Sequence, residues 1–252
     1  MSEAKCKYNL KDTTFIIPFM IDHKDRLENL NCILKFLDNN FDTNFILVET
    51  GEKSHYFDLL NIGAKHIFNP IKKKLFHRTK LINEGIKLSK TPYVSIYDTD
   101  VVFREDSIYE AIQKLKNGAT LSYPYNGDFI DIKRLYINDG IIAAMPGESH
   151  VIGSFGGACF LNIEDYIKCG MENENFKSHC PDDIERKTRV EKLGYRVERT
   201  EGKCYHITHW RGENSGGGRY TEANNAEWNK IKAMNKFELL NYVKSWPWAN
   251  QK

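Results

Sequence analysis

Short apolar runs alternate with helical patterns through the first hundred residues, and this alternation limits the choice of fold more than any other feature. The runs predict buried strands over residues 13–17, 45–48, 66–68 and 93–97. Leucines three or four positions apart and similar patterns predict helices over residues 24–37, 56–62 and 79–88. Such alternation is typical of an α/β fold, with a mostly parallel, Rossmann-like central sheet flanked by helices.

The predicted strands end at residues that can meet a ligand. Pro18 stops the first strand, Glu49 follows the second, and Asp98 follows the strand over 93–97. Ligands of parallel sheets bind beyond the carboxyl ends of the strands. We therefore expect Pro18, Glu49 and Asp98 to converge on one pocket.

The second half of the chain is less regular. Strands are predicted over residues 119–123 and 158–161, and a hairpin over 195–197 and 203–207. Helices are predicted over residues 129–137, 182–193 and 222–243, with a mobile loop at Gly216–Gly218. No linker or repeat divides the chain, so we expect a single domain over residues 1–252.

Composition narrows the class of protein. The 36 Lys and Arg nearly balance the 34 Asp and Glu, for a net charge of +2. This argues against a nucleic-acid partner, because phosphate binding normally needs a clear basic excess. The chain has no run of about 18 apolar residues, and its polar beginning lacks the apolar stretch of a signal peptide. Six scattered cysteines predict free thiols in a reducing cytoplasm.

Two motifs are candidates for a cation site. Asp98 and Asp100 stand two residues apart just after a buried strand, where one carboxylate can hold a hydroxylated ligand and the other a cation such as Mn²⁺ or Mg²⁺. The alternative for this pair is a solvated, aspartate-rich turn. His206 and His209 can both face one cation if they end a strand; the alternative is two ordinary polar histidines.

Three further segments have functional and structural interpretations. Asp182 and Asp183 begin a helix. There they either provide a general base or are simply stabilised by the positive end of the helix dipole. An aromatic beside an arginine, in the segment 76–80, suits base stacking and a diphosphate, whereas Lys72–Lys74 is a solvated loop. Gly156 and Gly157 allow a close approach of the backbone to a ligand, or form a turn.

In this order the motifs resemble those of GT-A fold glycosyltransferases, over residues 15 to 211. The resemblance is to the β-1,4-galactosyltransferase family (family 7) and to related bacterial family 2 enzymes. The matching segments are Ile17-Pro18-Phe19, the ten residues 76–85, Asp98-Thr99-Asp100-Val101, Phe155-Gly156-Gly157, Asp182-Asp183 and the eight residues 202–209.

The resemblance implies a metal-dependent, inverting transfer of a hexose or N-acetylhexosamine from a UDP-sugar donor to a glycan or glycolipid acceptor. It implies that Asp100, His206 and His209 bind Mn²⁺ or Mg²⁺, with Asp183 as general base and Asp182 orienting hydroxyls. The implied donor-binding residues are Pro18, Phe19, Glu49, Phe76, Arg78, Asp98, Gly156 and Gly157. The nucleotide-binding part would cover about 13–103, the acceptor and metal-completing part about 104–220, and a C-terminal helix about 222–245.

The sequence also departs from the family. The turn after Phe19 is longer, so either Lys24 or Arg26 reaches the diphosphate. The acceptor loop is replaced by the unrelated segment 176–181. Ser154 stands where the galactosyltransferases carry a tyrosine beside C2 of the donor sugar. We therefore expect room for an N-acetyl group.

Two rival functions use similar residues. A nucleotidyltransferase also needs carboxylates and a cation, but it expects a glycine-rich basic loop after the first strand, which Pro18–Asp22 does not supply. A non-catalytic nucleotide-sugar or glycan-binding module would keep the pocket and tolerate loss of the base.

The compartment and the resemblance together predict a bacterial enzyme of surface polysaccharide synthesis. The aromatic segment 237–248 either packs on the domain as a closing helix or makes a peripheral contact with the inner membrane.

Overall fold

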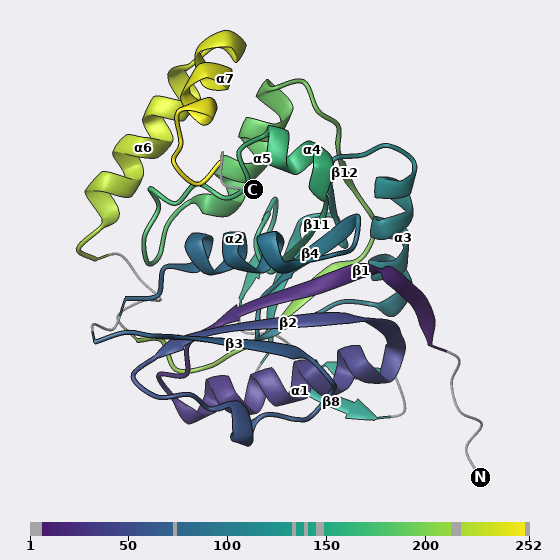
Figure 1. Ribbon diagram of the computed structural model, residues 1–252. Helices are drawn as coiled ribbons and strands as arrows, with labels where there is room; N and C mark the ends of the chain where they lie inside the picture. Colours follow the sequence, from purple (N-terminus) through teal and green to yellow (C-terminus); the bar gives the residue numbers. More distant parts are fainter. Residues whose placement is uncertain are drawn as a thin grey trace.

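The computed structural model describes residues 7–72, 75–132, 135–138, 141–144, 149–212 and 218–249. At the centre of this part of the chain lies a seven-stranded sheet with the order β12-β6-β11-β4-β1-β2-β3 (Figure 1). Its strands are β1 (Tyr8–Phe19), β2 (Phe41–Gly51), β3 (Lys65–Pro70), β4 (Tyr93–Tyr97), β6 (Leu121–Tyr123), β11 (Ala158–Asn162) and β12 (Val197–Arg199). Only β11 runs antiparallel to its neighbours among these strands. The predicted α/β fold with a mostly parallel sheet is confirmed.

Helices cover both faces of this sheet, as Figure 1 shows for α1 (Lys24–Asn40) and α2 (Arg78–Leu88) on opposite sides of β1 and β2. The leucines that predicted α1 are its buried stripe, since Leu30, Leu34 and Leu37 are fully buried. Gly85 lets α2 approach β1 closely, because a Cβ there would lie 2.4 Å from a methyl group of Ile16. The remaining helices are α3 (Glu105–Lys116), α4 (Ile163–Lys168), α5 (Asp182–Lys192), α6 (Thr221–Ala233) and α7 (Lys236–Lys244).

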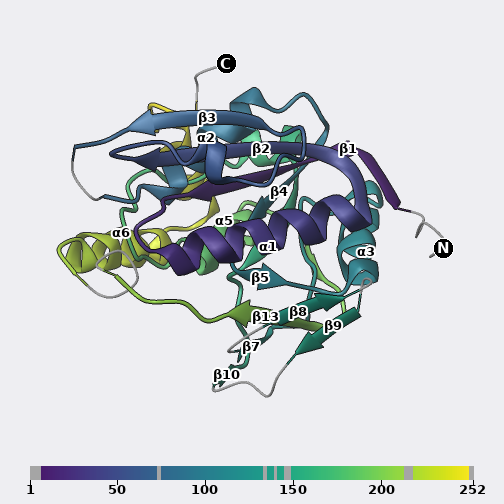
Figure 2. The same ribbon diagram turned by 90° about the horizontal axis from the view of Figure 1, so that it is seen from below.

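A second, four-stranded sheet lies beside α1 (Figure 2). The order of its strands is β10 (His150–Val151), β7 (Asp128–Ile132), β13 (Lys203–Ile207) and β5 (Val101–Val102). A separate two-stranded sheet pairs β8 (Leu135–Asn138) with β9 (Ile141–Ala144). The helix predicted over 129–137 is therefore wrong. In the segment 128–132 aspartates flank apolar residues, and its backbone pairs as a strand with β13. The predicted hairpin is also wrong, because β12 joins the large sheet and β13 the small one.

Three boundaries differ from the predictions. Pro18 does not stop β1, which continues to Phe19; registered pairing with β4 ends at Ile16, so a residue without an N–H is tolerated there. Only a short 3₁₀ turn, Tyr56–Asp58, stands in the helix predicted over 56–62. The long C-terminal helix is broken after Ala233, because Asn235 caps a new helix in a capping box with Glu238. Of the predicted glycine loop, residues 216 and 217 lie outside the described residues.

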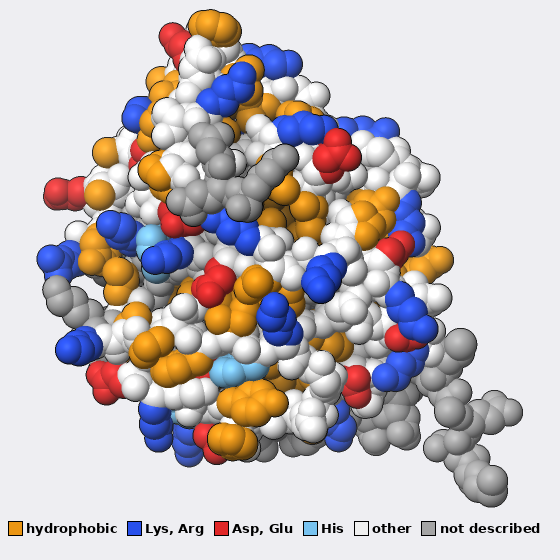
Figure 3. All heavy atoms as spheres, viewed as in Figure 1, with side chains coloured by type: hydrophobic (Ala, Val, Ile, Leu, Met, Phe, Trp, Pro, Cys, Tyr) orange, Lys and Arg blue, Asp and Glu red, His pale blue; other side chains and the backbone are white. Residues whose placement is uncertain are grey.

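The surface is mixed in charge, and the interior is mostly apolar with a few buried ion pairs. Figure 3 shows basic and acidic side chains interspersed over one face of the molecule. Trp246 is buried, and its ring centre lies 5.2 Å from that of Trp248, whereas Phe237 is exposed. The C-terminal segment therefore packs largely on the domain as a closing element. None of the described helices is long and apolar enough to cross a bilayer.

Candidate active site

Two adjoining cavities open at the carboxyl end of the central strands, and together we call them the cleft. The first has a volume of about 230 Å³ and the second about 530 Å³. The residues that line both cavities are Arg26, Asp98, Asp100, His179, Cys180 and Asp183. The cleft is therefore one continuous site, and Asp98, Asp100 and Asp183 lie where its two cavities adjoin.

Most of the residues predicted for the site line this cleft. Pro18, Phe19, Phe76, Arg78 and Asp182 line the first cavity. Ser154, Gly156, Gly157, His206 and His209 line the second cavity. Between the two candidates for a diphosphate contact, Arg26 lines both cavities, whereas Lys24 is not among the described residues that line either.

Glu49 is the exception, and the expectation that it would meet Pro18 and Asp98 in one pocket is wrong. Its carboxylate is fully buried and already occupied: one oxygen accepts from the backbone N–H of His55, and the other from the Ser54 hydroxyl. The imidazole rings of His55 and His66 lie 3.0 and 2.8 Å from the same carboxylate. Glu49 thus ties the turn after β2 to β3, outside the described lining of the cleft.

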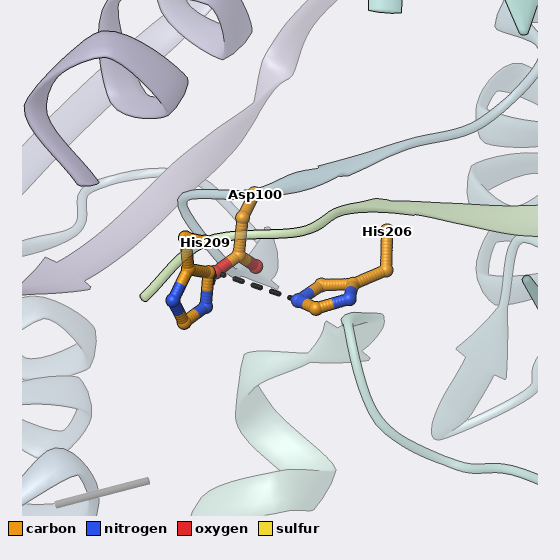
Figure 4. A group of neighbouring side chains, drawn as sticks. All are labelled: Asp100, His206 and His209. Carbon is orange, nitrogen blue, oxygen red and sulfur yellow. Dashed lines mark ion pairs between the residues drawn. The ribbon is translucent and has the colours of Figure 1, made fainter. Parts of the chain in front are cut away.

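Asp100, His206 and His209 form a compact group of metal-ligating side chains (Figure 4). One ligand atom from each residue lies within 4.8 Å of the other two. The Asp100 carboxylate is 3.0 Å from Nε2 of His209 and 3.8 Å from Nε2 of His206. Asp100 ends the turn after β4, and its backbone carbonyl accepts from the N–H of Ile207, which holds the two motifs side by side.

The two histidines of this group are oriented through their other ring nitrogens. Nδ1 of His206 lies 2.6 Å from a carboxylate oxygen of Asp131 on β7, and Nδ1 of His209 lies 2.7 Å from the backbone carbonyl of Trp210. Both contacts leave Nε2 directed toward Asp100. From α1, Asn29 donates to the carbonyl of Ile207 and so fixes the segment between the histidines.

The charges of this group stabilise one another. Burial disfavours the Asp100 carboxylate, but the neighbouring imidazoles of His206 and His209 outweigh it and hold the pKa of Asp100 well below its usual range. Burial likewise disfavours a charged His206, yet the carboxylates of Asp100 and Asp131 raise the pKa of His206. One carboxylate oxygen and two imidazole nitrogens are a donor set that fits a divalent transition metal.

Across the cleft, Asp182 and Asp183 begin α5 and are held by two arginines. Arg78 donates to Asp182 at 2.5 Å and to Asp98 at 2.8 Å. Arg186 donates to Asp183 at 2.8 Å, and two further nitrogens of the same guanidinium contact the buried carboxylate of Glu172 at 2.7 and 2.8 Å. The carboxylates on this wall are therefore neutralised by the protein itself.

The two aspartates differ in their freedom to react. Burial, then the neighbouring charge of Asp183, raises the pKa of Asp182 to about 6, and its oxygens contact Arg78 and the Cys180 thiol. For Asp183, Oδ1 accepts from Arg186, whereas Oδ2 faces Gly156, where a Cβ would lie only 3.2 Å away. Asp183 therefore presents one oxygen to the second cavity beside a glycine that leaves room for a substrate.

The turn at 153–157 is shaped by polar contacts beneath it. The Ser154 hydroxyl accepts from the N–H of Gly156, and the Tyr125 hydroxyl donates to the carbonyl of Gly156 at 2.7 Å. Arg199 donates to the carbonyl of Ser154 at 2.6 Å and stacks 4.1 Å from the Phe155 ring centre. Ser154 is thus a small residue in a fixed turn that borders the second cavity.

Three contributors to the site were missed by the sequence reasoning. Asp131 lies in a segment predicted to be helical, and the five residues of that segment that form β7 have no regular alternation of polar and apolar side chains that would have marked them as a strand. Arg186 stands three and four positions after the two aspartates, the spacing at which helical side chains meet. Arg199 has no local signal, because its partners come from other segments.

Comparison of the sequence with protein-family models finds no match, and comparison with curated protein sequences finds none either. Solved structures do match. The catalytic domain of Drosophila β1,4-galactosyltransferase 7, in complex with xylobiose, is 14% identical with a TM-score of 0.52, and the match covers 88% of this chain and 81% of that one. The chain has the GT-A fold.

Two further structures support this assignment of the fold. A variant of the same Drosophila enzyme, with manganese, UDP-Gal and xylobiose, is 13% identical with a TM-score of 0.50, over 88% of this chain and 79% of that one. GalNAc-T7 with UDP, GalNAc and Mn²⁺ is 12% identical with a TM-score of 0.60, over 94% of this chain and 51% of that one. The resemblance predicted from the motifs is confirmed at the level of the fold.

Proposed function

We propose that this chain is a metal-dependent, inverting glycosyltransferase that moves a hexose or N-acetylhexosamine from a UDP-sugar to a hydroxyl group of a glycan. The observation that carries the proposal is the pairing of two groups across one cleft. On one wall, Asp100, His206 and His209 form a cation site; on the other, Asp183 presents a carboxylate oxygen. Structures of the same fold hold UDP or UDP-Gal with manganese, which supports a UDP-sugar donor.

The donor set favours Mn²⁺ over Mg²⁺. Mg²⁺ prefers oxygen ligands in a regular octahedron, whereas this site offers two imidazole nitrogens beside one carboxylate. When bound, the cation would neutralise charge on the diphosphate of the leaving nucleotide. Asp100, His206 and His209 would hold it, and Arg26, 3.8 Å from Asp100 and lining both cavities, would add a positive charge for the phosphates.

Asp183 is the residue best suited to be the general base. Its Oδ2 would accept the proton of the acceptor hydroxyl while the hydroxyl oxygen attacks the anomeric carbon and the bond from that carbon to UDP breaks. A single displacement of this kind inverts the anomeric configuration. Arg186 holds the other oxygen of Asp183, so the base keeps one orientation through the reaction.

The remaining residues suggest how the donor lies. Phe76 and Arg78 on the first cavity suit a nucleotide, with Pro18, Phe19 and Asp98 around it. Ser154, Gly156 and Gly157 on the second cavity would border the sugar, and the small Ser154 supports acceptance of an N-acetylated sugar. The acceptor would enter past His179, Cys180 and Pro181.

A setting in bacterial surface polysaccharide synthesis in the cytoplasm is part of the proposal. The five cysteines in the described part of the chain are free thiols, in keeping with a reducing compartment. A peripheral contact with the inner membrane would involve Phe237 and nearby lysines rather than Trp246, which is buried.

The proposal is tested by binding and transfer together. Thermal-shift screening of UDP-sugars with and without Mn²⁺ should give a metal-dependent stabilisation by the true donor. With that donor, Asp183→Asn should lower kcat by about 10²–10⁴-fold, the usual contribution of a general base, and leave UDP affinity intact. Transfer by Asp183→Asn at close to the wild-type rate, with UDP still bound, would remove Asp183 from this role and favour a different base.

A further inference from the structure

We propose that Asp131 is a positioning residue that sets the orientation of His206 and thereby the affinity of the cation site. The inference rests on the proposed function, because it concerns the same site. Asp131 lies on β7, directly opposite His206 of β13 in the parallel register of the two strands. Its Oδ1 is 2.6 Å from Nδ1 of His206, the nitrogen that faces away from Asp100.

The geometry makes Asp131 a partner of a ligand rather than a ligand. The group whose ligand atoms lie within 4.8 Å of one another contains Asp100, His206 and His209. Among the described residues, Asp131 is not part of that group, and it does not line either cavity. A carboxylate that accepts from Nδ1–H fixes the tautomer with a lone pair on Nε2, the form that binds a metal.

Asp131 is itself held in place by two contacts with Ser149. Its Oδ2 accepts from the Ser149 hydroxyl at 2.5 Å, and its backbone N–H donates to the carbonyl of Ser149 at 3.0 Å. The ring of Phe129 lies 5.3 Å from that of His206 and limits its rotation. The chain of contacts from Ser149 through Asp131 to His206 therefore fixes the imidazole before any cation arrives.

The test is Mn²⁺ affinity measured by isothermal titration calorimetry on the full chain without sugar. Asp131→Ala should raise the Kd for Mn²⁺ by about 10–100-fold, the usual effect of losing such a partner. Asp131→Asn keeps an acceptor for Nδ1–H and should recover most of the affinity. At saturating Mn²⁺ the transfer rate of Asp131→Ala should approach that of the wild type, because the loss is in metal binding.

The matched control is Asp128→Ala. Asp128 lies on the same strand and also faces a histidine, with 3.6 Å between its carboxylate and Nε2 of His150, but it does not line the cleft. Its Kd for Mn²⁺ should stay at the wild-type value. Equal affinity in the wild type and Asp131→Ala would overturn the proposal, as would equal losses in Asp131→Ala and Asp128→Ala.

If Asp131→Ala does not fold, Ser149→Ala decides, because it removes the hydroxyl that holds the Asp131 carboxylate. Wild-type affinity for Mn²⁺ in Ser149→Ala would then contradict the proposal. The behaviour of the wild type separates this proposal from the proposed function. A wild-type chain that binds Mn²⁺ but transfers no sugar would contradict the glycosyltransferase and leave the effect of Asp131 standing. A wild-type chain that binds no Mn²⁺ overturns both.

Discussion

The two walls of the cleft differ in how their buried carboxylates are compensated. On the wall formed by the start of α5, Asp182 and Asp183 are matched by Arg78 and Arg186, so the protein carries its own counter-charges. On the opposite wall, Asp100 faces two histidines, which are charged only when protonated. The first wall is complete without a ligand, whereas the second has donor atoms for a cation. The comparison predicts that damage to the first wall lowers stability and damage to the second lowers metal affinity.

The largest effect is expected from Arg186→Gln. Arg186 and Glu172 are each about 1% exposed, and their contacts at 2.7 and 2.8 Å are replaced by nothing when the guanidinium is removed. Breaking a buried ion pair from one side costs about 3–5 kcal/mol, because the remaining charge stays buried. Urea denaturation should show a loss of that size in the free energy of unfolding.

Arg104→Gln is the control for this measurement. Arg104 pairs with Asp106 at the surface, where 68% of its side chain is exposed, so its loss should change the free energy of unfolding little. If Arg186→Gln were as mild as Arg104→Gln, the wall of α5 would not depend on its buried arginine and the contrast between the two walls would fail.

A pH dependence follows from Asp182 on the same wall. Burial, then Asp183, raises its pKa from 3.8 to about 6, so between these values the folded chain binds a proton that the unfolded chain releases. The wild type should therefore lose stability relative to Asp182→Asn as pH rises from about 4 through about 6, by at most about 3 kcal/mol in total and by roughly half of that between pH 5 and pH 8. Thermal or urea unfolding at pH 5 and pH 8 measures the second half of this change. Parallel curves would contradict it, and Asp106→Asn, which removes an exposed carboxylate, is the control.

On the metal wall, His209→Ala should act on affinity instead of stability. Loss of one of three ligands should weaken Mn²⁺ binding by about 100-fold or more, at or above the upper end of the range for losing a residue that only orients a ligand. His179→Ala is a fair comparison, because His179 lines both cavities but lies outside the ligand group. Calorimetric titration with Mn²⁺ checks both variants, and an unchanged metal response in His209→Ala would remove it from the ligand set.

Sequence patterns predicted the parts of the site that depend on local chemistry. Asp98 and Asp100 follow a buried strand, and the aspartates of α5 open a helix, so their places follow from periodicity and end signals. The order of the strands in the two sheets could not be predicted from such patterns. β7 and β13 are about 75 residues apart in the chain, and their pairing is what brings Asp131 to His206. No local pattern encodes such a contact, because it depends on how distant strands register.

Glu49 shows a second limit of the same reasoning. A position at the end of a strand predicts the edge of the sheet but not the direction of the side chain, since successive side chains point to opposite faces. The Glu49 carboxylate points toward the imidazole rings of His55 and His66, and its oxygens are occupied by contacts with them. The role of Glu49 is therefore set by the histidines that it contacts, and these contacts can be identified only from the folded structure of the turn after β2.

The smallest effect concerns the sugar itself and tests whether the turn at 153–157 discriminates between donors. Ser154→Tyr should lower kcat/KM for an N-acetylated UDP-sugar relative to its unacetylated counterpart by about tenfold or more, the scale on which a pocket rejects an extra group. The substitution also removes the hydroxyl that accepts from the N–H of Gly156, which would lower both rates. Ser154→Ala separates the two causes, because it loses the hydroxyl without adding bulk and should leave the ratio unchanged. Equal losses of kcat/KM with both donors in Ser154→Tyr would mean that the turn does not discriminate between donor sugars by the group at C2.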